Sequence, residues 1–265
     1  MVYIRTDANE NIATGHLSRC RTVAKKLRLL GESVIFIFRE DTSVELLESD
    51  EKYLMIQEGR GTEIQQMISI LSTSKDASLL LDLYEFDAFY MEQLKPYAYI
   101  ITFDDLFREK FPVNMIINYN FDCYEFDYKL RYSGTGTKLL LGPEYVPLRD
   151  EFYEKKSQVR KTVSTIMLVC GGGDNHHVLV NLLKLLCMQK MNDRYKIIVI
   201  AGFLNTDLEQ LYLYAKKFKN INESELTGPQ LRTFLSSKNN YYWAKEYIYG
   251  IEKDSRLAKT AKIAM

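Results

Sequence analysis

Short apolar runs that alternate with helical patterns are the feature of this sequence that most constrains its fold. Such runs stand at 34–38, 79–83, 97–103 and 115–118, and apolar residues recur at helical spacing over 17–30. Near-continuous apolar strands that alternate with helices are typical of parallel sheets covered on both faces. The sequence therefore predicts an α/β protein.

A charged segment near the middle of the chain divides this pattern. Residues 151–161 are rich in charged side chains, as expected of a linker, and a new strand run follows at 163–170. Only one further clear strand run, at 196–201, is found behind it, whereas a complete doubly wound lobe needs at least two more strands. We therefore predict two Rossmann-like lobes facing each other across a cleft, 1–152 and 162–265, the second short or incomplete.

Charge and cysteine content exclude several classes of protein. Lys plus Arg equals Asp plus Glu at 35 each, so no overall basic field favours nucleic acid or anionic lipid as a partner. The four cysteines are widely spaced, as expected of reduced thiols in a core. Neither an N-terminal leader pattern nor an apolar run of about 18 residues is found. We therefore expect a cytoplasmic protein without a membrane span, and the oligomeric state stays open.

The entrance of the first helix is the strongest candidate site. His16 stands in its first turn, behind a short strand and a polar loop. Free backbone N–H groups and the helix dipole attract anions at such a position, and a neutral imidazole there can accept a proton. The ordinary alternative for this histidine is a helix cap or a packed surface residue.

Seven short motifs occur in one order over roughly the first 175 residues. They are Arg5-x-Asp7-Ala8, Gly15-His16-x-x-Arg19-Cys20, Asp82-x-Tyr84, Phe103-Asp104-Asp105, Asn118-x-Asn120, Leu141-Gly142-x-x-Tyr145-x-x-Leu148-Arg149-x-Glu151-Phe152 and Gly171-Gly172-x-Asp174. Together they resemble the nucleotide-sugar hydrolases of pseudaminic acid biosynthesis, which cleave UDP from UDP-2,4-diacetamido-2,4,6-trideoxy-β-L-altropyranose. They also resemble the related spore coat polysaccharide biosynthesis proteins of the predicted glycosyltransferase type.

The resemblance implies a two-lobed glycosyltransferase-B fold, with the sugar near the first lobe and the uridine diphosphate mainly on the second. It implies that His16 is a general base, which takes a proton from a water that attacks the anomeric carbon as UDP departs, with no metal and no cofactor. Substrate-binding residues are then Arg5, Asp7, Gly15, Arg19, Asp82, Tyr84, Asp104 and Arg149, the last at the diphosphate. Nucleotide-binding residues are Gly171, Gly172, Gly173 and Asp174.

Several of these residues have structural alternatives. Arg5 and Asp7 either form a plain strand-end ion pair or act in the site, where Asp7 would orient the imidazole or a sugar hydroxyl. Arg19 meets a phosphate or a carboxylate, or is a solvated helix residue. Because neighbours at a strand end point to opposite faces, Asp104 and Asp105 are not expected to flank one bond, and Asp104 could instead cap the following turn.

The second lobe has alternatives of its own. Asp174 can cap a helix and also belong to a phosphate-binding turn. His176 and His177 suggest a metal site with Asp174, but adjacent helical residues project about 100° apart and seldom bind one ion together, so we expect no metal.

The chain departs from the family pattern at three places. Ala13 stands where the family usually has glycine, and Gly173 where it commonly has threonine. The Ser-rich turn and glutamate that hold uridine and ribose have no recognisable counterpart around 236–240. We therefore expect weak binding of uridine nucleotides and activity only at high substrate concentration, or none. A glycosyltransferase, in which a sugar hydroxyl replaces the water, and an inactive nucleotide-sugar-binding protein are the alternative functions.

Overall fold

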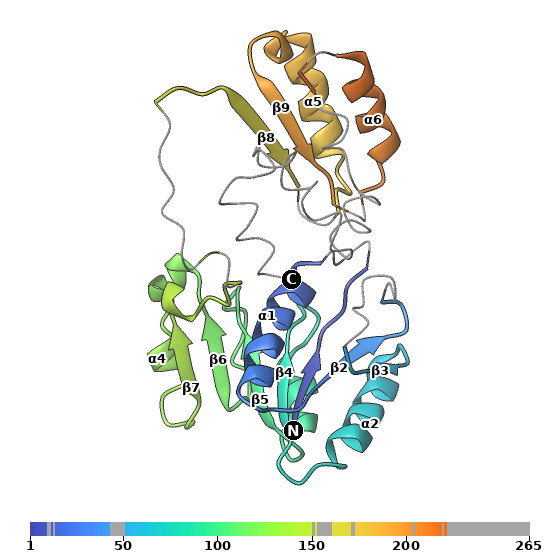
Figure 1. Ribbon diagram of the computed structural model, residues 1–265. Coiled ribbons are helices and arrows are strands. Elements are labelled where there is room, and N and C mark those ends of the chain that lie inside the picture. Colours follow the sequence, from blue (N-terminus) through green and yellow to red (C-terminus); the bar gives the residue numbers. More distant parts are fainter. Residues whose placement is uncertain are drawn as a thin grey trace. The chain divides into compact units, whose positions relative to one another are not determined.

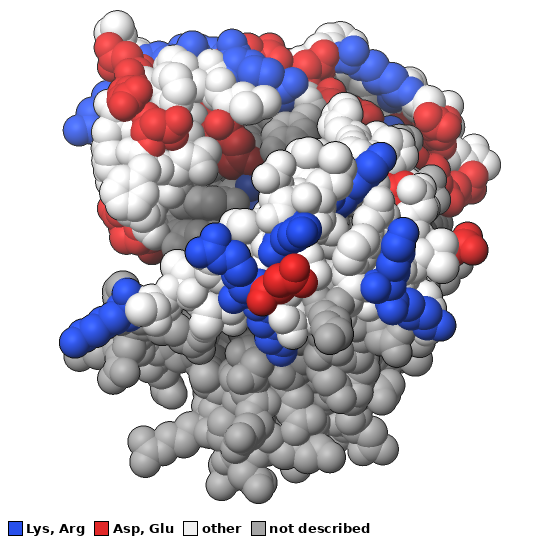
Figure 2. Space-filling model, turned by 90° about the horizontal axis from the view of Figure 1, so that it is seen from above, with Lys and Arg blue, Asp and Glu red and all other residues white. Residues whose placement is uncertain are grey.

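The computed structural model describes residues 1–9, 12, 14–42, 51–149, 152, 161–170, 173–202, 205–218 and 220–221. The chain divides into two compact units (Figure 1). The first comprises Met1–Asn9 and His16–Leu148, and the second comprises Glu10–Gly15 and Arg149–Met265. None of the described helices is long and apolar enough to span a membrane. Basic and acidic side chains are both spread over the face drawn in Figure 2.

A seven-stranded parallel sheet forms the centre of the first unit, in the order β3-β2-β1-β4-β5-β6-β7. Its strands are β1 (Val2–Arg5), β2 (Val34–Arg39), β3 (Tyr53–Ile56), β4 (Ser78–Leu81), β5 (Tyr99–Phe103), β6 (Met115–Asn118) and β7 (Lys138–Leu141). The strand order reverses between β1 and β4, and α/β sheets bind ligands beyond the carboxyl ends of the strands at such a point. The prediction of an α/β protein with a Rossmann-like parallel sheet is confirmed.

Helices cover both faces of this sheet. They are α1 (Gly15–Leu29), α2 (Arg60–Leu71), α3 (Ala88–Leu94) and α4 (Tyr128–Arg131), together with the short 3₁₀ helices η2 (Phe121–Glu125) and η3 (Pro143–Tyr145). Leu17, Cys20 and Ala24 of α1 are buried in one cluster with Ile4 of β1 and Leu80 of β4. Because side chains alternate along a strand, the residues next to these two point to the opposite face of the sheet.

Arg5 lies on that opposite face and is completely buried. Its Nε donates a hydrogen bond to Oε1 of Glu63 in α2 at 2.9 Å, and its Nη1 donates to Oδ1 of Asp7 at 2.6 Å. The hydroxyl of Tyr90 donates to the same oxygen of Glu63 at 2.9 Å. Burial lowers the pKa of Arg5, but the two carboxylates outweigh it and raise that pKa above its ordinary value. Arg5 and Asp7 therefore form the ion pair that was the structural alternative for them. This ion pair lies inside the protein rather than at its surface.

Two strands without a clear sequence signal lie at the edges of the sheet. In β3, Tyr53 and Leu54 are exposed, and none of the four residues of β7 is fully buried. Edge strands pack against fewer neighbours, so their sequences need not form the long apolar runs that mark central strands. Both strands have only four residues, which further weakens the pattern.

The described part of the second unit is a smaller parallel α/β unit. β8 (Thr165–Val169) pairs with β9 (Lys196–Ile200), and α5 (Val178–Met188), the 3₁₀ helix η5 (Met191–Asp193) and α6 (Leu208–Lys217) complete it. The two strands predicted behind the charged segment are both found. Residue Ile221 forms a parallel bridge with Ile197 of β9. Residues 222–265 lie outside the described part, so the incomplete second lobe stays a prediction.

The buried Arg5 network predicts a large loss of stability on substitution. Arg5→Met leaves the carboxylates of Asp7 and Glu63 buried without their cation, and we expect it to lower the free energy of unfolding by about 3–5 kcal/mol. Urea denaturation of both proteins measures this. The control is Arg60→Met, because Arg60 and its partner Asp87 are exposed, so that change should cost less than about 1 kcal/mol. A similar small change for both variants would contradict the expectation.

Candidate functional site

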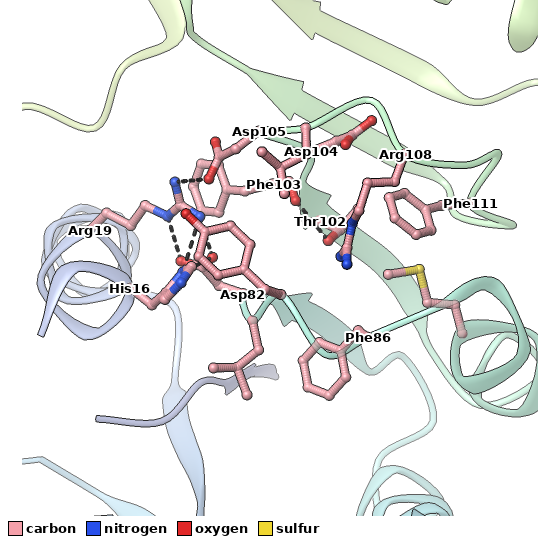
Figure 3. A pocket seen from close by; sticks show the side chains of 14 residues that line it. His16, Arg19, Asp82, Phe86, Thr102, Phe103, Asp104, Asp105, Arg108 and Phe111 are labelled. Atoms are coloured by element: carbon pink, nitrogen blue, oxygen red, sulfur yellow. Dashed lines mark hydrogen bonds and ion pairs between the residues drawn. The ribbon is translucent and has the colours of Figure 1, made fainter. Parts of the chain in front are cut away.

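A pocket lies at the carboxyl ends of β4 and β5, next to the first turns of α1 (Figure 3). His16 and Arg19 line it from α1, and the residues that follow β4 and β5 complete its wall. These are Asp82, Leu83, Tyr84, Phe86 and Met91 after β4, and Asp104, Asp105, Leu106, Arg108 and Phe111 after β5, with Thr102 and Phe103 from β5 itself. Its volume is about 10 Å³, which is the space for roughly one water molecule.

Asp82 is the centre of this site. Its Oδ1 accepts a hydrogen bond from Nδ1 of His16 at 2.7 Å, and its two oxygens accept from Nη2 and Nε of Arg19 at 2.5 and 2.6 Å. The thiol of Cys20 donates to Oδ2 at 3.3 Å. Burial raises the pKa of Asp82, but the hydrogen bonds from Arg19 and His16 outweigh it and leave that pKa below its ordinary value. Asp82 is therefore an ionised carboxylate at neutral pH.

The carboxylate of Asp82 determines which nitrogen of His16 carries the proton. An ionised carboxylate only accepts hydrogen bonds, so the shorter contact, with Asp82, makes Nδ1 of a neutral ring the donor and leaves the lone pair on Nε2. Nη2 of Arg19, which can only donate, lies farther from the same Nδ1, at 3.2 Å. Nε2 makes no hydrogen bond with the described residues. The ring of Tyr84 packs edge-on against the imidazole, with centroids 4.6 Å apart and an angle of 79°. The imidazole is thus held in one orientation, and Nε2 is an acceptor without a partner among the described residues.

Arg19 is a positioning residue in this site. Apart from Asp82, it donates through Nη1 to Oδ2 of Asp105 at 2.7 Å and to the hydroxyl of Tyr119 at 2.8 Å. Its guanidinium lies over the ring of Phe103, 4.4 Å from the centroid. The sequence left a phosphate, a carboxylate or solvent as the partner of Arg19, and the structure shows carboxylates. Burial lowers the pKa of Arg19, but its hydrogen bonds to Asp82 raise it above its ordinary value.

Asp104 and Asp105 point in different directions, as the alternation of a strand predicts (Figure 3). Asp105 reaches Arg19, whereas Oδ1 of Asp104 accepts from the backbone N–H of Phe107 at 2.9 Å and Oδ2 accepts from the hydroxyl of Tyr128 at 2.9 Å. Burial raises the pKa of Asp104. Asp104 therefore stabilises the turn after β5, which is the structural alternative for this residue, and Asp105 supplies the carboxylate that contacts Arg19.

Arg5 and Asp7 do not line the pocket that the described residues form. Besides Arg5, Asp7 accepts hydrogen bonds from the backbone N–H of Arg39 at 2.7 Å and from the hydroxyl of Thr42 at 3.1 Å. Asp82, not Asp7, holds the imidazole of His16, so the expectation that Asp7 orients that ring is wrong. The physical reason is that Arg5 ends β1 on the face of the sheet that α2 covers, and Asp7 is bound to Arg5 there.

The remaining predicted substrate residues have different surroundings. Tyr84 lines the pocket beside His16. A Cβ added to Gly15 would meet no heavy atom within 4 Å, so packing among the described residues does not require glycine there. Arg149 belongs to the second unit, where its guanidinium lies 5.1 Å from the ring centroid of Phe152. Its contact with a diphosphate stays a prediction.

Asp174 caps α5. Its Oδ1 accepts from the backbone N–H of Val178 at 2.9 Å and its Oδ2 from that of Leu179 at 2.8 Å. Burial raises the pKa of Asp174, and these backbone hydrogen bonds lower it below its ordinary value. Two N–H groups that could bind a phosphate are thus occupied by a carboxylate. Gly173 is described, but Gly171 and Gly172 lie outside the described residues, and the phosphate-binding turn stays a prediction.

His177 forms a second imidazole–carboxylate pair, with Nδ1 2.7 Å from Oδ2 of Asp207. Unlike His16, its side chain is 56% exposed. No group of three or more His, Cys, Asp or Glu side chains that could hold a metal ion is found among the described residues.

A larger pocket of about 240 Å³ lies at the amino ends of β5, β6 and β7. It is lined by residues such as Lys95, Asn114 and Thr137, and it contains no histidine or carboxylate. Open parallel sheets build their sites at the carboxyl ends of the strands, so we assign the candidate site to the smaller pocket.

Sequence patterns missed three residues as members of this site. Asp105 stands next to Asp104, which the sequence analysis assigned to the site. Tyr119 lies inside the Asn118-x-Asn120 motif, and Arg108 belongs to none of the seven motifs. Their common signal is position, because each follows the end of β5 or β6 by a few residues.

Comparison with protein-family models finds no model that matches this chain, and comparison with curated proteins finds no significant match.

The lowered pKa of Asp82 predicts a pH-dependent contribution to stability. A carboxylate with a depressed folded-state pKa stabilises the fold fully above its ordinary value of 3.8 and loses that contribution as the pH falls through the lower folded value. The difference in free energy of unfolding between the wild type and Asp82→Asn should therefore be constant above about pH 5 and shrink below about pH 4. Urea denaturation at a series of pH values measures it. A difference that stays constant down to pH 3 would contradict the assignment.

Proposed function

We propose that this chain is a nucleotide-sugar hydrolase in which His16 activates a water molecule. The observation that carries the proposal is the 2.7 Å hydrogen bond from Nδ1 of His16 to the ionised Asp82, which leaves Nε2 as a free acceptor. General bases of this kind need an oriented ring with one unprotonated nitrogen in reach of the reacting proton. The ring of His16 is oriented by Asp82, and its free nitrogen lies at the edge of the sheet where α/β enzymes bind their substrates.

The proposed reaction is a single displacement. A water molecule in the pocket gives a proton to Nε2 of His16 while its oxygen forms a bond with the anomeric carbon. The bond between that carbon and the diphosphate oxygen breaks, and its electron pair leaves with UDP. Asp82 stabilises the imidazolium that forms, and Arg19 holds Asp82 in place. Because the water and the leaving group occupy opposite faces of the sugar, the product has inverted anomeric configuration.

The small space beside His16 fits water as the attacking molecule. This space has a volume of about 10 Å³, which is room for about one water molecule. The donor sugar would then lie across the mouth of the pocket. A transferase would use the same donor and the same base, and it stays the alternative function.

The identity of the substrate and the role of the second unit rest on the motif resemblance. It supports a UDP-linked diacetamido-trideoxy hexose, in pseudaminic acid or surface polysaccharide biosynthesis, and a glycosyltransferase-B arrangement in which the second unit binds UDP. The capping of α5 by Asp174 takes up two N–H groups, which fits the expectation that UDP is bound weakly.

Substitution of His16 tests the proposed base. His16→Asn should lower kcat for release of UDP from this UDP-sugar by roughly 10²-fold or more, the usual scale for a lost general base. A coupled assay for free UDP measures it. The matched control is His177→Asn, which removes the exposed imidazole–carboxylate pair of the second unit and should leave kcat unchanged. Equal kcat values for the wild type and His16→Asn would remove His16 from the mechanism.

Isotopic labelling tests which bond breaks. In water enriched in ¹⁸O, attack at the anomeric carbon places the label in the free sugar and leaves UDP unlabelled. Mass spectrometry of both products after limited turnover measures this, and a control in which unlabelled products are incubated with the enzyme corrects for exchange. Label in the phosphate of UDP would show attack at phosphorus and defeat the proposed mechanism.

A further inference from the structure

Arg108 is a cation without a partner in the wall of the candidate site. It lies in the loop after β5, and its side chain lines the same pocket as His16 (Figure 3). Its guanidinium makes no hydrogen bond or ion pair with the described residues, whereas Arg19, the other cation of the pocket wall, contacts two carboxylates. Arg108 is also exposed, so a ligand at the mouth of the pocket can reach it.

The backbone next to Arg108 is strained. Phe107 has a φ of 51°, in the left-handed region that aromatic residues rarely adopt. Such residues persist only where their surroundings fix them, and they cluster at ligand-binding sites. The strained conformation of Phe107 therefore requires contacts that hold it, and it indicates a ligand-binding site nearby.

Hydrogen bonds fix this turn on both sides of Arg108. Oδ1 of Asp104 accepts from the backbone N–H of Phe107 at 2.9 Å. Nη1 of Arg131 donates to the carbonyl oxygen of Phe107 at 2.9 Å and to that of Glu109 at 3.2 Å. The residues before and after Arg108 are thus tied to the same arginine, while the side chain of Arg108 itself is left unpaired.

Aromatic packing holds the side chain of Phe107 as well. Its ring stacks on Phe126 with centroids 4.9 Å apart and meets Tyr128 edge-on at 4.6 Å. The guanidinium of Arg131 lies over the same ring, 3.3 Å from the centroid. The turn is therefore fixed before any ligand arrives, and this lowers the entropic cost of binding through Arg108.

We propose that Arg108 binds a phosphate oxygen of the substrate at the mouth of the pocket. This rests on the proposed function and adds to it a phosphate contact supplied by the first unit. Three carboxylates, Asp82, Asp104 and Asp105, line the pocket, and Arg19 is already engaged by two of them. A further cation favours the approach of an anion to such a site. A guanidinium also binds phosphate in a planar, bidentate geometry that a lysine cannot reproduce.

The imidazole NMR signals of the full chain test this proposal without any need for turnover. The chain has three histidines, so the signal of His16 is assigned from the spectrum of His16→Asn, and the other two report on the second unit. The probe is inorganic pyrophosphate. It should shift the His16 signal saturably in the wild type and in the control Arg60→Met, which removes the same charge from an exposed ion pair.

Arg108→Met should weaken this response by about 10- to 100-fold, the scale of hydrogen bonds to a charged group, and Arg108→Lys should fall between the two. An unchanged affinity in Arg108→Met, or a wild-type His16 signal that does not respond to pyrophosphate, would overturn the proposal. Kinetics of His16→Asn judge the proposed function separately, because the binding of pyrophosphate to the wild type is measured without any turnover.

Discussion

The buried carboxylate of Asp82 is the interaction on which the rest of the site depends. A charge that is only 1% exposed must be compensated, and Asp82 is compensated entirely by α1, through His16, Arg19 and the thiol of Cys20. The same contacts fasten the first turns of α1 to the end of β4 and fix the tautomer of the imidazole. The carboxylate of Asp82 therefore serves both the stability of the fold and the proposed reaction. His16 is held as the proton acceptor because the fold requires a partner for this buried charge.

Two polar clusters lie at the carboxyl ends of β1 and β4, and they differ in their access to a pocket. The cluster of Arg5, Asp7 and Glu63 is sealed between the sheet and α2 and serves the fold. The cluster around Asp82 borders a pocket, and Nε2 of His16 has no partner among the described residues. Paired charges alone do not identify an active site. The second cluster is distinguished by its place in the wall of a pocket, which neither Arg5 nor Asp7 nor Glu63 lines.

Neighbouring residues in the turn after β5 have different roles. Asp104 and Tyr128 hold the strained turn from inside, and Asp105 and Arg108 face the pocket. Hydrogen bonds fix the backbone from which Arg108 extends, and a fixed backbone lowers the entropic cost of binding a phosphate through its side chain. The strain at Phe107 is thus linked to the proposed role of its neighbour.

The sequence by itself determined the α/β class, the central strands with their long apolar runs, and the place of His16 in the first turn of a helix, because these depend on local periodicity. It also determined that Asp104 and Asp105 point apart. Only the tertiary structure decided which carboxylate meets His16: Asp82 is 66 residues away in sequence, yet its strand β4 is the neighbour of β1. Strand order and the face toward which each strand end points place Asp82 and Asp105 beside α1 and Arg5 beside α2. Local spacing carries no information about either, because both arise from long-range packing of the sheet.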